Sequence, residues 1–296
     1  MKELEKHLKE KGKTSSWISL ANEFNYLVGE SDKKRSDGVR RLFNKLSINV
    51  DNTKIHITLG CVHVPFHNEK LINSLLAFIS EYKDKIGGFH IIGDFLDLKS
   101  LSSHDDGVVD KSGLTLGKEY SEGNRILDMF DTILPNIPKT FIFGNHEDRY
   151  FRTISSPKAN KFADALISPI DALKLKERGY KVLDNWKEDY VTIGKYQAFH
   201  GIYCTQTPAK THVSKLKHSC IFAHTHRIDQ YFEGELHGVN IGCFADIESS
   251  GFKYLSRIER KFWKNGFGIT HVNGKQSHTE VIVCENGHFF YAGKQY

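Results

Sequence analysis

Five short motifs in this sequence carry side chains that can bind metal ions, and three of these motifs begin with glycine. The glycine motifs are Gly60-Cys61-Val62-His63, Gly93-Asp94-Phe95-Leu96-Asp97 and Gly144-Asn145-His146-Glu147. The other two are Phe199-His200-Gly201 and Ala223-His224-Thr225-His226, in which alternation places two imidazoles on one face of an extended chain. Imidazole, thiolate and carboxylate groups are usual ligands of transition-metal ions. The five motifs together therefore predict a metal centre.

Each glycine motif follows a short apolar run that predicts a strand. The runs are residues 55–59, 89–92 and 140–143, and the intervening segments 71–79 and 119–134 have the periodicity of amphipathic helices. In a parallel sheet built this way, the carboxyl ends of neighbouring strands lie at one edge and form the site. Glycine permits the sharp turn that directs the next side chain into a shared pocket.

The second half of the chain is richer in strands than in helices. Beyond Asp184, short β-branched and aromatic runs recur up to residue 292, with turn residues between them. Strand–helix alternation followed by such a half predicts an α/β fold, a two-sheet β-sandwich flanked by helices. This domain is expected to span residues 51–296.

The first 50 residues predict a separate, all-α module. Leucine and aromatic spacing indicates helices over 3–11, 17–28 and 38–46, with Ser36 or Asp37 as the cap of the third. Eleven lysines and arginines oppose seven acidic residues here, a net charge of +4 out of +5 for the whole chain. The spacing resembles a helix-turn-helix unit, which binds nucleic acid through basic residues. The candidates are Lys33, Lys34, Arg35, Arg40 and Arg41. The alternative is an ordinary solvated helical face.

The overall composition is that of a globular protein inside a cell. Of the 296 residues, 39% are hydrophobic and 26% charged, and no apolar run is long enough to span a bilayer. The polar start shows no signal-peptide pattern. The five cysteines are scattered without a C-x-x-C pair, which favours a reducing cytoplasm over a disulfide framework.

The motifs, in this order, resemble the calcineurin-like metallophosphoesterase family. That family has D-x-H, G-D-x-x-D, G-N-H-[DE], a single H and G-H-x-H, and the resemblance covers roughly Lys54 to Phe244. The run Trp263-x-x-Gly266-Phe267 is similar to bacteriophage or prophage members. The resemblance implies a metallophosphoesterase fold and, for a phage-encoded protein, the cytoplasm of a bacterial host.

The resemblance also implies a ligand set for two divalent transition-metal ions. One ion would be held by Cys61, His63, Asp94 and His226, and the other by Asp94, Asn145, His200 and His224. Asp94 would bridge the two ions. Mixed nitrogen and oxygen ligands favour Mn, Fe, Zn or Ni over Ca.

The implied reaction is hydrolysis of a P–O ester bond by a metal-bridging hydroxide. His146 would protonate the leaving oxygen, and Asp97 would orient its imidazole. Arg149 is a candidate for binding the phosphoryl oxygens, with a structural ion pair as the alternative. His104, in the loop after the second motif, is a candidate for substrate contact.

Cys61 and Ala223 depart from the family pattern. Cys61 stands where the family usually has Asp, an exchange that also occurs in RNA lariat-debranching enzymes together with Ala-His-x-His. A thiolate ligand would favour Zn or Fe at that position over Mn or Mg. The alternative is a buried thiol that binds nothing. Ala223 precedes the ligands and is expected to contribute backbone only.

The basic N-terminal module favours a phosphodiesterase or nuclease with a nucleic-acid substrate. Two alternatives stay open at this stage. One is a phosphomonoesterase acting on proteins or small molecules, because the metal ligands are shared. The other is a non-catalytic nucleic-acid-binding protein with a degenerate metal site.

Overall fold

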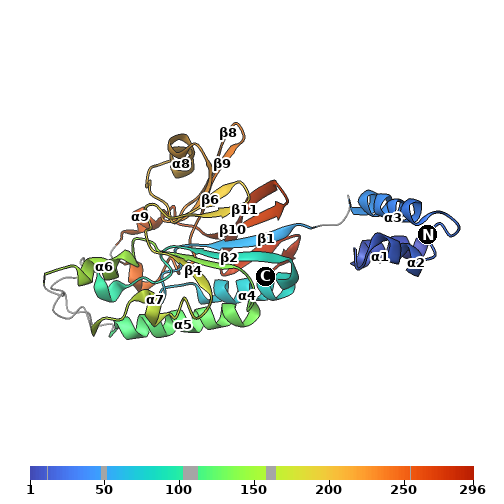
Figure 1. The fold of residues 1–296 in the computed structure, drawn as a ribbon. Helices are drawn as coiled ribbons and strands as arrows, with labels where there is room; N and C mark the ends of the chain where they lie inside the picture. Colours follow the sequence, from blue (N-terminus) through green and yellow to red (C-terminus); the bar gives the residue numbers. More distant parts are fainter. Residues whose placement is uncertain (12, 48–51, 103–112, 158–164, 254) are drawn as a thin grey trace. The chain divides into compact units, whose positions relative to one another are not determined.

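The structure, a computed structural model, describes residues 1–296 except 12, 48–51, 103–112, 158–164 and 254. The chain divides into two compact units, Met1–Asn52 and Thr53–Tyr296 (Figure 1). Among the described residues, no helix has both the length and the apolar composition needed to cross a membrane.

The smaller unit consists of three helices, α1 (Lys2–Lys11), α2 (Trp17–Glu23) and α3 (Asp32–Ser47). Ser16 caps α2, because its side chain accepts a hydrogen bond from the Ser19 amide. The helices enclose a small apolar core. Its fully buried residues are Leu4, Leu8, Leu20, Ala21 and Val39.

The boundaries of α2 and α3 differ from the sequence expectation. Helix α2 ends at Glu23 rather than at residue 28, since Asn25 and Leu27 adopt positive φ angles that a helix cannot contain. Helix α3 starts at Asp32, so Ser36 and Asp37 lie inside it and cap nothing. The connection, residues 24–31, is longer than the three-to-four-residue turn of a helix-turn-helix.

The larger unit contains an eight-stranded sheet in the order β13-β12-β11-β10-β1-β2-β3-β4. Four neighbouring strands are parallel: β1 (Lys54–Leu59), β2 (Ile86–Ile92), β3 (Lys139–Ile142) and β4 (Tyr180–Leu183). Strand β10 (Asn265–Asn273) pairs antiparallel with β1, and β11 (Gln276–Glu285), β12 (His288–Tyr291) and β13 (Lys294–Gln295) extend that side. The three strands that precede the glycine motifs are therefore direct neighbours with a common direction.

A second sheet has five strands in the order β5-β6-β7-β9-β8. They are β5 (Val191–Ile193), β6 (Tyr196–Ala198), β7 (Ser219–Phe222), β9 (Leu236–Ile241) and β8 (Ile228–Glu233). Strands β6 and β7, which precede the two histidine motifs, are parallel neighbours. The second sheet thus positions its histidines in the same way as the first sheet positions its motifs.

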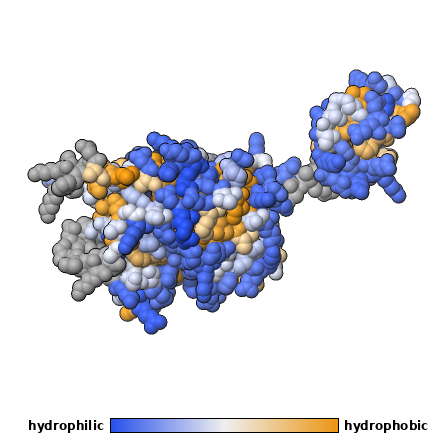
Figure 2. Space-filling view, turned by 90° about the horizontal axis from the view of Figure 1, so that it is seen from below, coloured by the Kyte–Doolittle hydropathy of each residue, from blue (hydrophilic) through white to orange (hydrophobic). Residues whose placement is uncertain are grey.

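Helices cover the outer face of each sheet (Figure 1). Helices α4 (Glu69–Tyr82) and α5 (Leu116–Ile133) pack on the larger sheet, where Phe78 and Phe130 join the same buried cluster as Phe89. Helix α8 (Pro208–Leu216) packs on the smaller sheet through Val213. The short helices α6 (Asp148–Ile154), α7 (Pro169–Ala172) and α9 (Arg257–Arg260) lie in connections. From the side of α4 and α5, the surface is mainly hydrophilic with apolar areas between (Figure 2).

The two sheets face each other across a second apolar cluster. Ile92 and Ile142 of the larger sheet join Ile193, Ile221 and Val239 of the smaller sheet in this cluster. The layers are therefore helix, sheet, sheet and helix. This confirms the predicted α/β class with two sheets flanked by helices.

Candidate metal centre

The five motifs converge at the ends of β1, β2, β3, β6 and β7. Several candidate ligands occupy the left-handed backbone region, with φ of 51° at Cys61, 55° at His63 and 51° at Asp94. His224 and His226 have φ of 58° and 57°. Such angles are uncommon outside glycine, and they concentrate at functional sites where the surrounding structure enforces them. The turns thus direct several polar side chains into one region at a cost in backbone strain.

One glycine is required by close packing at this place. A Cβ atom on Gly144 would lie 2.1 Å from Oδ1 of Asp94 and 2.4 Å from its amide nitrogen. Asp94 in turn uses Oδ1 to accept a hydrogen bond from the His146 amide at 2.9 Å. The second and third motifs are therefore in direct contact, and any larger residue at 144 would separate them.

Two groups of potential ligands share Asp94. Cys61, His63, Asp94 and His226 form the first group, and Asp94, His200 and His224 form the second. Within each group, the donor atoms lie within 4.8 Å of one another. Asn145 adjoins the second group, since its Oδ1 lies 3.0 Å from His200 Nε2. The structure therefore brings together all seven residues that the sequence singled out. We call the first group the thiol set and the second, with Asn145, the amide set.

The hydrogen bonds around the imidazoles direct the remaining ring nitrogens at other potential ligand atoms. His200 Nδ1 donates to the Ile92 carbonyl at 3.0 Å, and its Nε2 faces Asn145 Oδ1 at 3.0 Å. Burial would lower the pKa of His200, but the charge of Asp94 raises it above its usual value. The same Nε2 lies 3.3 Å from Asp94 Oδ2. A proton or a metal ion at Nε2 would offset the charge of the carboxylate, and the oxygen and nitrogen atoms here are ligand types of divalent transition metals. The amide set therefore fits a bound metal ion.

The thiol set shows the same pattern. His63 Nδ1 donates to Asp97 Oδ2 at 2.9 Å, which directs its Nε2 to within 2.9 Å of His226 Nε2. Carboxylates and carbonyls that fix ligand imidazoles in this way are typical of metal centres. Nδ1 of His224 and Nδ1 of His226 have no hydrogen-bond partner within the described structure. Burial lowers the pKa of His224 to about 4, so this ring is in the neutral form that binds metal.

Charge in the centre is concentrated on Asp94. Burial would raise the pKa of this carboxyl, but the imidazoles of His200, His146 and His63 hold it well below its usual range. Cys61 behaves in the opposite way. Burial, reinforced by the charge of Asp94, raises the pKa of its thiol well above the ordinary value. The Cys61 Sγ accepts a hydrogen bond from the His224 amide at 3.1 Å, and a divalent cation would favour its thiolate.

His146 and Asp97, the predicted acid and its orienting partner, are in contact beside the centre. His146 Nδ1 donates to the backbone carbonyl of Asp97 at 2.7 Å, while the Asp97 carboxylate is 3.5 Å away. That carboxylate is closer to His63, so Asp97 serves two imidazoles through two different groups. Burial lowers the pKa of His146 to about 4. Its Nε2 remains available on the side that faces the metal ligands, 4.0 Å from Asp94 Oδ2.

Arg149 lies at the same edge and contacts both residues. Its Nη1 donates to the Asp97 carbonyl at 2.9 Å and lies 3.6 Å from the Asp97 carboxylate. Its Nη2 lies 3.4 Å from His146 Nε2. The structural reading of Arg149 as an ion pair therefore has direct support. A guanidinium so close to Nε2 is also within reach of an anionic group bound beside His146.

Two buried glutamates support the centre, and the sequence analysis assigned a role to neither. Glu147 is fully buried and accepts amide hydrogen bonds from Asp94, Leu96 and Gly144 at 2.7–2.9 Å. It therefore fastens the second motif to the third. Glu119, on α5, accepts from the amides of Lys99 and Ser100, which follow Asp97. The acidic position that closes the third motif was a sequence signal for Glu147, and Glu119 had no such signal.

Aromatic rings enclose the ligands on both sides. The Trp186 ring lies 6.0 Å from that of His200 and 6.1 Å from that of His224. On the other side, Trp263 lies 4.1 Å from the His226 ring, and Phe252 lies 5.5 Å from the His63 ring. Rings in these positions limit access of water and fix the imidazoles. These aromatic residues lie apart from the motifs in the sequence, so the motifs did not predict that they enclose the ligands.

The remaining predicted site residues lie elsewhere. His104 falls outside the described residues. The five basic candidates of the N-terminal module belong to the smaller unit, where Lys33, Lys34, Arg40 and Arg41 are exposed. Arg35 is mostly buried, and its guanidinium donates to the carbonyls of Ala21 and Tyr26 at 3.1 and 2.9 Å. Arg35 therefore stabilises the module, since it satisfies carbonyls at the end of α2.

Comparisons with known proteins assign no family to the chain. No family model matches it, and no curated protein is significantly similar in sequence. Among solved structures, vacuolar protein sorting 29 from Cryptosporidium parvum gives a TM-score of 0.44 at 13% identity, covering 82% of this chain and 98% of that chain. Zinc-complexed Vps29 from Entamoeba histolytica gives 0.41 at 12% identity, covering 82% and 96%. The nuclease MPE from Pseudomonas putida gives 0.33 at 11% identity, covering 76% and 87%. Scores below 0.5 assign no activity.

Proposed function

We propose that this chain is a metal-dependent phosphoesterase of the calcineurin-like metallophosphoesterase type, and that it hydrolyses phosphodiesters. The observation that carries the proposal is the pair of ligand sets that share Asp94. Two adjacent metal positions joined by one carboxylate are the arrangement that two-metal phosphoesterases use. His200 Nε2 and His63 Nε2 face this carboxylate at 3.3 and 3.8 Å, where a divalent cation would bind to the imidazoles and the carboxylate together.

The donor chemistry limits which ions would bind. Cys61, His63, Asp94 and His226 would hold one ion, and Asp94, Asn145, His200 and His224 the other. A position with a sulfur ligand favours Zn or Fe, whereas an amide, a carboxylate and imidazoles also suit Mn or Ni. When bound, such ions polarise phosphoryl oxygens and make water acidic enough to act as a nucleophile near neutral pH.

His146 would handle the proton of the leaving group. Its Nδ1–H is fixed on the Asp97 carbonyl, so only Nε2 can exchange a proton with a substrate. The ring is neutral in the free protein because burial lowers its pKa to about 4. An anionic phosphoester beside the ring would raise that pKa, since a nearby negative charge favours the imidazolium. Arg149, next to Nε2, would contact the same anion.

The small helical unit favours a nucleic-acid substrate. Residues 1–50 carry a net charge of +4, and Lys33, Lys34, Arg40 and Arg41 are exposed on α3. Exposed cations on one helix bind phosphate backbones through counterion release, independent of sequence. With Arg35 used in packing, these four residues are the ones to test for binding.

Hydrolysis assays with defined esters would test the function. The chain should be loaded separately with Mn, Zn or Fe and assayed on bis-p-nitrophenyl phosphate, p-nitrophenyl phosphate, cyclic nucleotides, single-stranded DNA, RNA and branched RNA. We expect cleavage of diesters, strongly reduced in His146→Ala. Preference for the monoester would show a phosphomonoesterase instead. No cleavage, with no metal bound by elemental analysis, would show a binding protein and exclude the enzyme.

A further inference from the structure

A cavity on the smaller sheet is lined by segments that adjoin metal ligands in the sequence. It has a volume of about 560 Å³, and its walls include Cys204, Gln206, Arg227, Asp229 and Phe262. Ligand pockets for small organic molecules typically have volumes of about 300–1,000 Å³. The size therefore suits a nucleoside or a residue of similar bulk.

The walls of this cavity continue segments that carry metal ligands. Arg227 directly follows His226, and residues 204–206 lie in the connection that leaves His200. Phe262 precedes Trp263, whose ring lies 4.1 Å from the His226 ring. The Lys264 amide also donates to the His226 carbonyl at 2.8 Å, which holds the segment in place. The walls of the cavity are therefore connected through short stretches of chain to His200 and His226.

Arg227 brings an uncompensated charge into the cavity. It is partly buried and forms no ion pair or hydrogen bond with any residue that the structure describes. Its only ring contact places Cζ 5.4 Å from the centre of Phe262. The Asp229 carboxylate in the same wall instead accepts the Ala209 amide at 3.0 Å, at the start of α8. A partly buried guanidinium with five donors and no acceptor is suited to bind an anion.

Phe262 offers an exposed aromatic surface beside that charge. The residue is 55% exposed, and Lys261 Nζ also lies 4.8 Å from the centre of its ring. Aromatic rings next to cations are the usual platform for bases in single-stranded nucleic acids. The base stacks on the ring, and the cations bind the backbone phosphates. The pair of Arg227 and Phe262 thus has the two features that a nucleotide needs.

We propose that this cavity binds the nucleotide adjacent to the phosphodiester under attack, with Arg227 on its phosphate and Phe262 against its base. This rests on the proposed phosphodiesterase function and extends it, because it names the substrate as a nucleic-acid strand. A phosphopeptide would use the guanidinium but has no base to stack on Phe262.

Steady-state kinetics on two substrates would test the assignment. The 5′-phosphorylated thymidine dinucleotide has a base and a second phosphate, whereas bis-p-nitrophenyl phosphate has neither. We expect Arg227→Gln and Phe262→Leu each to raise KM for the dinucleotide about tenfold more than KM for bis-p-nitrophenyl phosphate, given the strength of base stacking. Equal changes on the two substrates would overturn the proposal.

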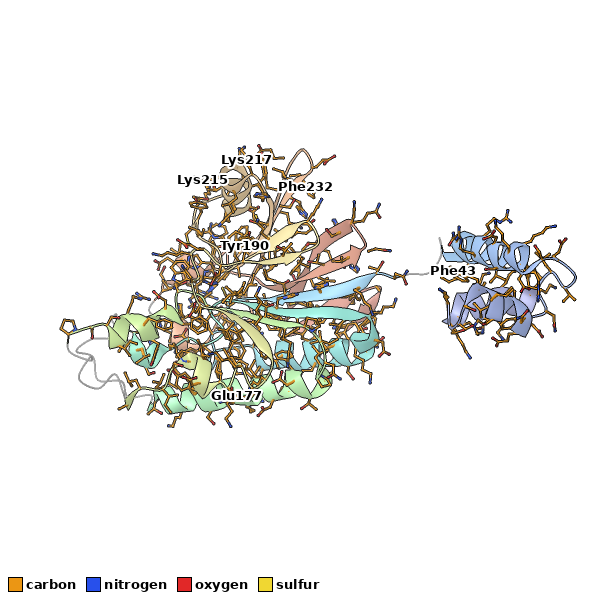
Figure 3. The ribbon with its side chains drawn as sticks, in the orientation of Figure 1. Phe43, Glu177, Tyr190, Lys215, Lys217 and Phe232 are labelled. Atoms are coloured by element: carbon orange, nitrogen blue, oxygen red, sulfur yellow. The ribbon has the colours of Figure 1, made fainter. Side chains whose placement is uncertain are left out.

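Matched control variants lie away from the cavity. Phe290→Leu removes another exposed ring, with 68% exposure on β12. Lys176→Gln removes an exposed charge. Its neighbour Glu177 lies on the opposite side of this unit from Lys215 of α8 and from Lys217, the residue that follows α8 (Figure 3). Both controls should keep the wild-type KM on each substrate. A control that matches the effect of the cavity variants would refute the inference.

Binding measured without turnover would separate this inference from the proposed function. Fluorescence anisotropy of the labelled dinucleotide should show about tenfold weaker binding by each cavity variant. The wild type could cleave no ester and yet bind the dinucleotide more tightly than the cavity variants do. That result would support the cavity assignment and contradict the proposed phosphodiesterase activity. Cleavage by the wild type with unchanged binding by the variants would show the reverse. A phosphoserine peptide that competes better than the dinucleotide would also overturn the nucleotide assignment.

Discussion

The thiol set and the amide set of the candidate centre share a carboxylate but differ in chemistry and support. The thiol set contains a sulfur atom, and its His63 is fixed by the carboxylate of Asp97. The amide set contains no sulfur, and its His200 is fixed by the backbone carbonyl of Ile92. A carboxylate makes the imidazole a stronger donor than a neutral carbonyl does, because its charge raises ligand basicity.

This difference indicates two positions of unequal preference rather than two equivalent ones. Cys61 requires a cation to ionise, since burial and Asp94 raise the pKa of its thiol. The amide set has no thiol to ionise, because its ligands other than Asp94 are two imidazoles and an amide. We therefore expect the thiol set to select the softer metal and the amide set to accept several.

Loss of the shared ligand should have the largest effect. Asp94→Asn removes the only negative charge common to both sets, so both positions should lose metal together. We expect the affinity for each ion to fall by more than about 100-fold. This exceeds the loss that is typical when a residue that hydrogen-bonds to a metal ligand is removed. Elemental analysis and hydrolysis of bis-p-nitrophenyl phosphate would measure this, with circular dichroism as the check on folding. One ion retained at full occupancy would show that the sets are independent.

Asp97→Asn should affect the two sets unequally. The variant loses the charged partner of His63 but keeps the backbone carbonyl that orients His146. Metal affinity of the thiol set should fall about 10–100-fold, while that of the amide set changes less. Titration with a metal-sensitive indicator would resolve the two positions. Equal losses in both sets would remove the basis for treating the sets as distinct.

Exchange of Cys61 should change metal preference more than metal content. Cys61→Asp provides the oxygen ligand usual in the family, so preference should shift from Zn toward Mn by about tenfold. Cys61→Ser should bind both metals more weakly. Competition between Zn and Mn, followed by elemental analysis, gives the ratio. An unchanged ratio in Cys61→Asp would identify Cys61 as a buried thiol without a ligand role.

The smallest effect is expected from Glu119, whose carboxyl accepts hydrogen bonds from the amides of Lys99 and Ser100. Burial raises the pKa of Glu119 from 4.5 to about 7, so the folded chain binds a proton there more tightly than the unfolded chain. This contribution to stability is fully present below pH 4.5 and is lost as the pH rises through 7. Wild type should lose about 2 kcal/mol through this group between pH 5 and pH 8.

Denaturant unfolding at several pH values would measure that loss. Glu119→Gln cannot titrate, so its free energy of unfolding should fall less across the same range. Glu177→Gln, an exposed carboxyl, is the matched control and should keep the wild-type slope. The free energy of unfolding of Glu119→Gln could instead fall as steeply with pH as that of wild type. In that case the Glu119 carboxyl is ionised across the whole range and does not stabilise the folded chain at acid pH.

The sequence was sufficient for the layout of the larger unit, because local patterns there agree with the tertiary structure. Apolar runs before the glycine motifs predicted β1, β2 and β3, and the structure makes them parallel neighbours. Residue spacing was a poorer guide in the small unit. It predicted a helix over residues 17–28, whereas α2 ends at Glu23. The Arg35 guanidinium reaches carbonyls at the end of α2 there, a contact between distant residues that no local period reports.

The residue types that can bind metal, and their order, were determined by the sequence itself. Their placement at strand ends also followed from it, because strand and turn signals are local. Only the tertiary structure decided which nitrogen of each imidazole faces the other ligands, since that depends on contacts such as His200 with Ile92 and His63 with Asp97. It also decided that Glu147 and Glu119 support the motifs and that Arg227 lies beside Phe262. These facts depend on atoms far apart in the chain, and folding alone brings those atoms within hydrogen-bonding or van der Waals distance.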